Sequence, residues 1–329
     1  MDKNDIFREV QKRLMDIPIF LIGTGVTIPL GIPGMDILAT HLTNNLGDKY
    51  KKDRVWEQIV EKLETGTDLE NALTEIRVEG DLFEDITIET WNLITEADLR
   101  VFRQARIAGK RLPLANLINK FYQHHPQCLN IITTNYDRVI EYACDQIRVL
   151  VDTRYQGNYI RYFSNAKLKK TNVVNLLKVH GSLDLFRNST GLVCTIPLQE
   201  ELPEGFTPEI ITPGAMKYKA VLTGDSRNIL HEADSVINEA SAFLCIGYGF
   251  NDEQIQDRVI AGLDAGKPIV LVTKCVSEDA GHLLANHSNN YVIIEENPEK
   301  KMATRFTINR EYEYLDETYW TIDGFMQII

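Results

Sequence analysis

Short apolar runs alternate with amphipathic segments along most of the chain. The apolar runs stand at residues 19–22, 129–133, 174–179, 243–247, 269–273 and 291–294. Buried strands of a parallel sheet read as continuous apolar runs, and amphipathic helices connect them and cover both faces of the sheet. The pattern therefore predicts an α/β fold, a Rossmann-like parallel sheet with helices on both faces.

Residues 36–125 interrupt this alternation with a long and mainly helical pattern. Within it, Thr67 and Glu70 have the spacing of a capping box at the start of a helix. We expect one domain over residues 1–329, with its Rossmann-like core at about 17–35 and 126–329 and an inserted helical module at about 36–125.

The second half of the chain adds three local signals. Asn251 stands where an N-cap would begin a helix, and Gly266 would end that helix. The stretch 184–215 is rich in Pro, Gly, Ser and Thr, which predicts irregular structure with short strands. The polar stretch 295–301 predicts a surface turn before a last hairpin or helix.

The composition is ordinary for a globular protein, with 44% hydrophobic and 25% charged residues among 329. The net charge of −12 argues against a broad attraction to nucleic acid or to an anionic membrane, so no direct nucleic-acid binding is expected. No apolar run approaches the roughly 20 residues of a membrane span, and the first residues lack the apolar core of a signal peptide. The prediction is a cytoplasmic protein without a membrane partner.

The cysteines form an odd and scattered set: Cys128, Cys144, Cys194, Cys245 and Cys275. Most of them fall in apolar segments, where a reduced thiol behaves as a small hydrophobe. This usage predicts a reducing compartment and no disulfides. Neither CxxC nor HExxH spacing occurs, so no metal site is expected.

A glycine loop, Gly23-Thr24-Gly25-Val26-Thr27, follows the first apolar run. Glycines at such a place let backbone N–H groups approach a phosphate, and a following helix N-terminus adds a favourable dipole. Ile28 stands where a dinucleotide fingerprint needs its third glycine, and no P-loop pattern occurs. A tight strand-to-helix turn is the alternative for this loop. Gly31-Ile32-Pro33 follows it.

Thr133-Thr134-Asn135-Tyr136-Asp137 comes directly after a second apolar run and directly before a helical pattern. In an open α/β sheet, ligands bind where strands end in this way. Asn135 is the candidate ligand-binding side chain. For Asp137 the alternative, a structural cap on the helix that follows, is equally natural.

His180 ends a third apolar run and is followed by Gly181 and Ser182. A histidine after an apolar strand is more often a satisfied structural residue than a catalyst. Imidazole nevertheless suits general-base chemistry because it titrates near neutrality. His180 is therefore the candidate base.

A fourth strand end reads Gly247-Tyr248-Gly249-Phe250. The small residues permit close approach of a dinucleotide, and the two aromatic rings can pack on adenine or ribose. The alternative for Phe250 is a side chain that faces the core.

The four motifs together resemble the sirtuin-like (SIR2) family. Sirtuins carry Gly-Ala-Gly-(Ile/Leu)-Ser followed by Gly-Ile-Pro, where this chain has Thr24 and Thr27 in place of Ala and Ser. Their Thr-Gln-Asn-Ile-Asp corresponds to 133–137, and their Leu-His-Gly to the segment around His180. The Thr-Thr-Asn-Tyr-Asp and Gly-Tyr-Gly-Phe-Asn-Asp forms are similar to those of bacterial SIR2-like effectors.

The resemblance implies NAD as substrate. It implies that Asn135 contacts the nicotinamide ribose and orients water, and that His180 is the general base. It implies a cofactor-binding set as well: Gly23, Thr24, Gly25, Thr27, Pro33, Thr134, Asp137, Gly247, Tyr248, Gly249 and Phe250.

The chain also departs from the deacylases of that family. The zinc-binding cysteines and the Asp-Phe-Arg that usually follows Gly-Ile-Pro are absent; Gly34-Met35-Asp36 stands there instead. The resemblance therefore implies an NAD+ glycohydrolase (NADase) of antiphage defence, which depletes NAD in the infected cell. It further implies a homo-oligomer and a regulatory partner such as a HerA-type ATPase, an Argonaute or another phage sensor.

Two other functions stay open on the sequence. The first is an NAD-dependent protein deacylase or ADP-ribosyltransferase, which cleaves the same bond with a different acceptor. The second is a non-catalytic module that binds NAD or ADP-ribose as a signal. The presence of both Asn135 and His180 argues against the non-catalytic module.

Overall fold

The computed structural model describes residues 1–107, 109–214 and 224–329, and within them the main sheet has nine strands in the order β14-β13-β12-β11-β10-β1-β2-β6-β3. The strands are β1 (Ile19–Ile22), β2 (Cys128–Thr133), β3 (Val151–Asp152), β6 (Val173–Lys178), β10 (Phe243–Ile246), β11 (Ile269–Val272), β12 (Tyr291–Glu296), β13 (Thr304–Ile308) and β14 (Glu311–Leu315). Pairing is parallel from β12 through β3 and antiparallel along β12, β13 and β14. The predicted α/β fold with a parallel sheet is confirmed. The polar stretch 295–301 begins inside β12, and both the hairpin β13–β14 and a short last helix follow it.

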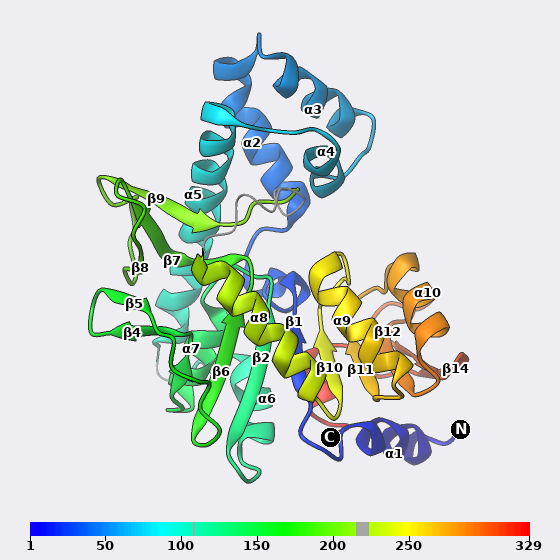
Figure 1. Ribbon diagram of the computed structural model, residues 1–329. Helices are drawn as coiled ribbons and strands as arrows, with labels where there is room; N and C mark the ends of the chain where they lie inside the picture. The colour runs from blue at the N-terminus through cyan, green and yellow to red at the C-terminus, as the bar shows by residue number, and fades with distance from the viewer. Residues whose placement is uncertain (108, 215–223) are drawn as a thin grey trace.

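Helices cover both faces of this sheet. They are needed on both, because successive side chains of β1 point to opposite faces and all of these side chains are apolar. Ile19 and Leu21 join the cluster under α8 (Gly224–Glu239), α9 (Glu253–Asp264) and α10 (Glu278–His287). Phe20 and Ile22 join the cluster under α1 (Lys3–Arg13), α6 (Pro113–Tyr122), α7 (Val139–Gln146) and α11 (Ile322–Phe325). Figure 1 shows α8 and α9 passing in front of the strands. Both faces are therefore apolar, which is the burial that a parallel sheet needs.

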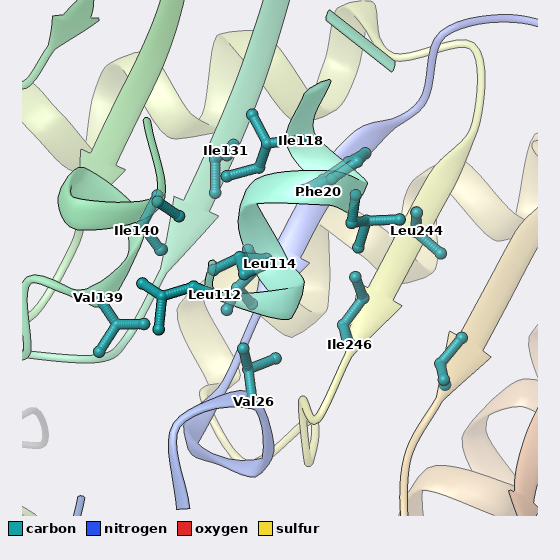
Figure 2. Packing of buried hydrophobic residues seen from close by; sticks show 14 of the residues in the cluster. Phe20, Val26, Leu112, Leu114, Ile118, Ile131, Val139, Ile140, Leu244 and Ile246 are labelled. Carbon is teal, nitrogen blue, oxygen red and sulfur yellow. The ribbon is translucent and has the colours of Figure 1, made fainter. Parts of the chain in front are cut away.

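The core directly beneath the glycine loop is built by α6. In Figure 2, Leu114 of this helix lies near Val26, whose side chain points from the glycine loop into the same cluster, and Ile118 lies beside Ile131 of β2. Phe20 of β1 completes the contact, its ring 5.2 Å from that of Phe121 at an edge-to-face angle. The glycine loop is thus held against the core by the side chain of Val26.

A helical module stands beyond one edge of the sheet (Figure 1). It consists of α2 (Met35–Tyr50), α3 (Arg54–Glu64), α4 (Leu69–Glu75) and α5 (Gly80–Ala105), which lie between β1 and α6. The first three helices and the start of α5 have a core of their own, with Leu42, Trp56, Ile59 and Leu73 among its buried members. The second half of α5 joins the main core through Trp91 and its neighbours instead.

A second sheet of five strands, in the order β4-β5-β8-β7-β9, lies beside the first. Its strands are β4 (Tyr155–Gly157), β5 (Arg161–Phe163), β7 (Gly181–Asn188), β8 (Val193–Thr195) and β9 (Phe206–Ile210). The expectation of irregular structure with short strands over 184–215 agrees with the described residues, in which the end of β7, β8 and β9 are short antiparallel strands separated by longer connections. Most of the Pro and Gly residues of this stretch lie in those connections.

Two predicted helix starts lie one residue from the observed ones. The cap of α4 is Asp68, whose Oδ1 accepts from the Asn71 N–H at 2.9 Å, and Thr67 precedes it. The cap of the α9 turn is Asp252, whose Oδ1 accepts from the Ile255 N–H at 3.2 Å, and Asn251 precedes it. In both cases a neighbouring carboxylate, an equally good capping group, occupies the position.

Candidate functional site

Four strand ends meet at one edge of the main sheet. In the parallel register Ile22 is level with Thr133 on one side and with Ile246 on the other, and Thr133 is level with Lys178. From β1 the chain continues to β2 and β6 on one side, then returns to β10 on the other side of β1. This reversal is a topological switch point, and open α/β sheets bind their ligands in the crevice there.

The glycines at the switch point allow two backbones to touch. A Cβ on Gly23 would lie 2.3 Å from the Gly247 oxygen, and a Cβ on Gly25 would lie 2.6 Å from the Gly247 Cα. Gly247 itself has φ +56°, a left-handed conformation that glycine adopts without strain. The glycine loop after β1 and the loop after β10 are therefore packed against each other at the edge of the sheet.

The backbone donors of the glycine loop serve this packing. The N–H groups of Gly23 and Gly25 donate to the carbonyls of Ile246 and Gly247, both at 3.1 Å, and that of Thr27 donates to the Thr24 carbonyl at 2.9 Å. Two short 3-10 turns follow, Thr24–Val26 and Ile28–Leu30, rather than an α-helix. The expectation of free donors at a helix N-terminus was therefore wrong for these three N–H groups, because the chain at β10 binds those of Gly23 and Gly25 and the loop's own 3-10 turn binds that of Thr27.

The exposed part of the loop is small. Thr24 and Gly25 are exposed, whereas Gly23 and Thr27 are buried. Pro33 is half-buried at the entrance to α2, and Thr134 is half-buried just past β2. A ligand at this edge therefore reaches the tip of the loop and not its base.

Asn135 is buried at the centre of the site. Its backbone N–H donates to Thr133 Oγ1 at 3.1 Å, and its Nδ2 donates to the Gly23 carbonyl at 3.2 Å and to Thr27 Oγ1 at 3.4 Å. Its Oδ1 is buried and has no hydrogen-bond partner in the protein. A buried acceptor without a partner costs free energy unless a ligand or water satisfies it. The amide is thus held by its donor side and presents its acceptor.

Two buried charged side chains form hydrogen bonds with the backbone after Asn135, one from each side. Lys178 Nζ donates to the carbonyls of Tyr136 at 3.1 Å and Asp137 at 2.5 Å. Asp98 of α5 is fully buried and accepts from the backbone N–H of Arg138 at 2.7 Å and from its Nε at 2.9 Å. The loop that carries Asn135 is therefore fixed to both β6 and the helical module.

Asp137 is a structural residue in this arrangement. It is buried, and its Oδ1 accepts from the Val139 N–H at 3.2 Å at the start of α7. Burial raises the pKa of this carboxyl to about 6, although the nearby Lys178 lowers it. The geometry agrees with the capping alternative.

His180 pairs with a carboxylate. Its Nε2 lies 2.6 Å from Oδ2 of Asp252, the residue that also caps α9. The His180 carbonyl accepts from the Ile211 N–H at 2.9 Å, and the Ile211 carbonyl accepts from the Tyr136 hydroxyl. A carboxylate at Nε2 fixes the proton on that nitrogen and leaves Nδ1 as the basic one. The sequence did not predict this partner, because it lies 72 residues away along the chain.

The aromatic side chains after β10 face the core. Tyr248 and Phe250 are 6% and 4% exposed, and their rings contact each other edge-to-face at 5.0 Å. The expectation that these rings pack on adenine or ribose was wrong, and the core-facing alternative for Phe250 is the observed one. Packing against β10 and α9 buries more apolar area than an exposed loop would. Gly249, between them, is exposed.

The described residues contain no group of three or more His, Cys, Asp and Glu side chains that could hold a metal ion. No helix in residues 1–107, 109–214 or 224–329 is long and apolar enough to cross a membrane.

These features define an α/β protein with a candidate ligand site at the switch point of its sheet. A family model described as a SIR2-like domain matches residues 129–307, more than half of the chain, so the chain belongs to the SIR2-like family. The matched segment contains Asn135, His180 and Asp252, and it begins after the helical module.

Solved sirtuin structures resemble the fold at low sequence identity. A sirtuin studied for its substrate affinity is 12% identical, with a TM-score of 0.47 over 88% of this chain and 93% of that one. A Sir2 homologue in complex with NAD is 13% identical, with a TM-score of 0.42 over 84% and 82% of the two chains. No curated protein matches the sequence. At these values the likeness is one of fold and assigns no role to any residue.

Proposed function

We propose that this protein is an NAD+ glycohydrolase that cleaves the nicotinamide–ribose bond to give nicotinamide and ADP-ribose. The observation that supports it best is the convergence of Asn135 and the His180–Asp252 pair on one switch point. The first supplies a buried amide oxygen without a partner, and the second supplies an oriented imidazole. The site thus offers an acceptor for a ribose hydroxyl or a water, and a base beside it.

The chain's residues then act as follows. Asn135 Oδ1 accepts a hydrogen bond from the ribose or from the attacking water, while Thr27 and Gly23 hold its Nδ2. His180 accepts a proton from a ribose hydroxyl or from that water, and Asp252 stabilises the imidazolium that forms. The bond from C1′ of the ribose to nicotinamide breaks with oxocarbenium character. Water adds to C1′, so NAD+ and H₂O give nicotinamide, ADP-ribose and one proton.

Membership of the SIR2-like family supports NAD as the substrate. The departures from the deacylases of that family, which are the missing zinc-binding cysteines and the missing Asp-Phe-Arg, favour water as the acceptor. One solved structure that resembles this fold is a Sir2 homologue in complex with NAD. In the described residues the second sheet stands beside the site, and the five cysteines are free and form no metal-binding group. We further propose a cytoplasmic homo-oligomer that depletes NAD during antiphage defence, restrained by a partner such as a HerA-type ATPase, an Argonaute or another phage sensor.

Nicotinamide release from NAD+ by purified wild type and site variants tests this proposal. We expect His180→Ala to lower kcat by about 10²–10⁴-fold, the usual loss of a general base, and Asn135→Ala to do at least as much. His231→Ala, an exposed histidine on α8, is the matched control and keeps wild-type activity. Full activity in both site variants would refute the site assignment. Turnover only with an acyl-lysine peptide would replace the hydrolase with a deacylase.

A further inference from the structure

One residue of the Thr-Thr-Asn-Tyr-Asp motif has three backbone partners at the edge of the sheet. Thr133, the last residue of β2, is buried. Its Oγ1 donates to the Ile22 carbonyl at 2.7 Å and accepts from the Asn135 N–H at 3.1 Å. Its own carbonyl accepts from the Val179 N–H at 3.1 Å. Thr133 therefore contacts the end of β1, the residue Asn135 and the segment directly before His180.

The chemistry of the groups around Oγ1 fixes the direction of both side-chain bonds. A backbone carbonyl can only accept a hydrogen bond and a backbone N–H can only donate one, whereas a hydroxyl does both. The proton of the Thr133 hydroxyl therefore points to Ile22, and a lone pair of its oxygen faces Asn135. A side chain of the same shape without a hydroxyl would lose both bonds.

The side chain of Asn135 is bonded to the same part of the chain as its backbone. Its Nδ2 donates to the Gly23 carbonyl and to Thr27 Oγ1. Gly23 directly follows Ile22. The backbone of Asn135 is thus bonded through Thr133 to the last residue of β1, and its side chain is bonded directly to the residue after it. Because both are held by one segment, the direction of the unpartnered Oδ1 is fixed.

We propose that Thr133 is a positioning residue: its hydroxyl sets the backbone of Asn135 relative to the glycine loop, and so directs Oδ1 toward the ligand. The catalytic part of this inference rests on the proposed NAD+ hydrolysis, whereas the positioning of the amide does not. The bond from Val179 goes to the backbone carbonyl and stays in place when the side chain changes. Substitutions of Thr133 therefore act on Asn135 and leave the segment before His180 as it is.

A second threonine makes the same pair of bonds far from the site. Thr304 of β13 is fully buried, and its Oγ1 donates to the Glu317 carbonyl and accepts from the Tyr319 N–H, both at 2.7 Å. Strands β12, β11 and β10 separate β13 from β1. Thr304→Val therefore removes the same kind of bonds as Thr133→Val without affecting Asn135, and is the matched control. If Thr133→Val does not fold, Thr133→Cys and Thr304→Cys, which keep a weak S–H donor, replace the valine pair with the same contrast expected.

The kinetics of nicotinamide release separate positioning from stability. We expect Thr133→Val to lower kcat by about 10–100-fold, since small misplacements of catalytic groups cost that much, with KM for NAD+ within about threefold of wild type. Thr133→Ser keeps the hydroxyl and should retain kcat to within about threefold. Thr304→Val should lose a comparable amount of stability in urea denaturation and keep wild-type kcat. An equal fall in kcat in both valine variants would overturn the inference.

A measurement without turnover separates this inference from the proposed function. The Nδ2 signals of Asn135 are recorded by nitrogen NMR of protein labelled at asparagine and are assigned by their loss in Asn135→Ala. They should shift or broaden in Thr133→Val and match wild type in Thr133→Ser and Thr304→Val. If wild type releases no nicotinamide, the proposed function fails and these signals alone judge Thr133. Unchanged Asn135 signals in Thr133→Val would overturn the inference.

Discussion

At the edge of the sheet, some side chains are placed to face a ligand, and other side chains hold the first group in position. Asn135 and His180 follow strand ends, so the sequence could place them. Their supports could not be read from local pattern: Thr27 and Asp252 contact them from 108 and 72 residues away. The free Asn135 Oδ1 and the hydrogen bonds of Asp137 and Asp252 to helix N–H groups depend on which atoms face each other, and only the folded chain shows that.

Asp252→Asn is expected to damage activity without damaging the fold. Asparagine caps a helix about as well as aspartate, so α9 should stay intact and the unfolding free energy should change by only about 0.5 kcal/mol. An amide cannot stabilise the imidazolium of His180 and favours the wrong tautomer, so kcat should fall about 10²–10⁴-fold. Nicotinamide release and urea denaturation, measured on the same preparation, check both parts. A variant that is fully active would remove Asp252 from the mechanism.

The pKa of Asp137 predicts a specific pH dependence of stability. Burial raises this pKa to about 6, above the unfolded value of about 3.9, so the folded protein binds the proton more tightly. Stability from this group is greatest below the unfolded pKa and is lost as pH rises through the folded pKa. Across pH 4 to 7 the loss is about 2 kcal/mol.

Asp137→Asn removes that titration and keeps an oxygen that accepts from Val139. The difference in unfolding free energy, wild type minus variant, should fall by about 2–3 kcal/mol between pH 4 and pH 7. Guanidinium denaturation at the two pH values measures it. A difference that stays constant across this range would show that Asp137 is ionised throughout, contrary to the burial described above.

At the scale of elements, the strands were the most predictable part of the fold. The runs predicted at 129–133, 174–179 and 243–247 correspond to β2, β6 and β10, because a fully buried strand carries its own apolar signal. The second sheet carries no such signal. Its strands are short and their pairing is nonlocal, and β7 even shows a register shift between Gly181 and Phe186. Pairing of this kind is decided by tertiary packing, not by local pattern.

The contact between the β1 and β10 loops predicts opposite effects for one substitution at two sites. Gly23→Ala places a Cβ 2.3 Å from the Gly247 oxygen, so we expect a loss of about 1–3 kcal/mol in the unfolding free energy. Gly47→Ala, inside α2 with nothing within 4 Å of the new Cβ, should gain about 0.5–1 kcal/mol. Thermal or urea unfolding distinguishes the two. Equal stability of both variants would contradict the close packing at the switch point.

At the scale of the whole molecule, a parallel sheet provides the strand ends and a helical module covers one side of them. The module has its own core, yet Asp98 of α5 reaches the loop after β2 and accepts from the backbone N–H of Arg138. The sequence indicated a long helical segment in this region. It did not indicate the contact of Asp98, since neither spacing nor periodicity relates this residue to Asn135 or His180.

The central claim concerns the fate of NAD+, and a product balance tests it most directly. Purified protein is incubated with NAD+ in water without a peptide, and nicotinamide and ADP-ribose are quantified together by chromatography. Hydrolysis predicts equal amounts of the two products, with both formed about 10²–10⁴-fold more slowly by His180→Ala. Nicotinamide without matching free ADP-ribose would show transfer to another acceptor, and NAD+ bound yet intact in wild type would contradict hydrolysis by this chain.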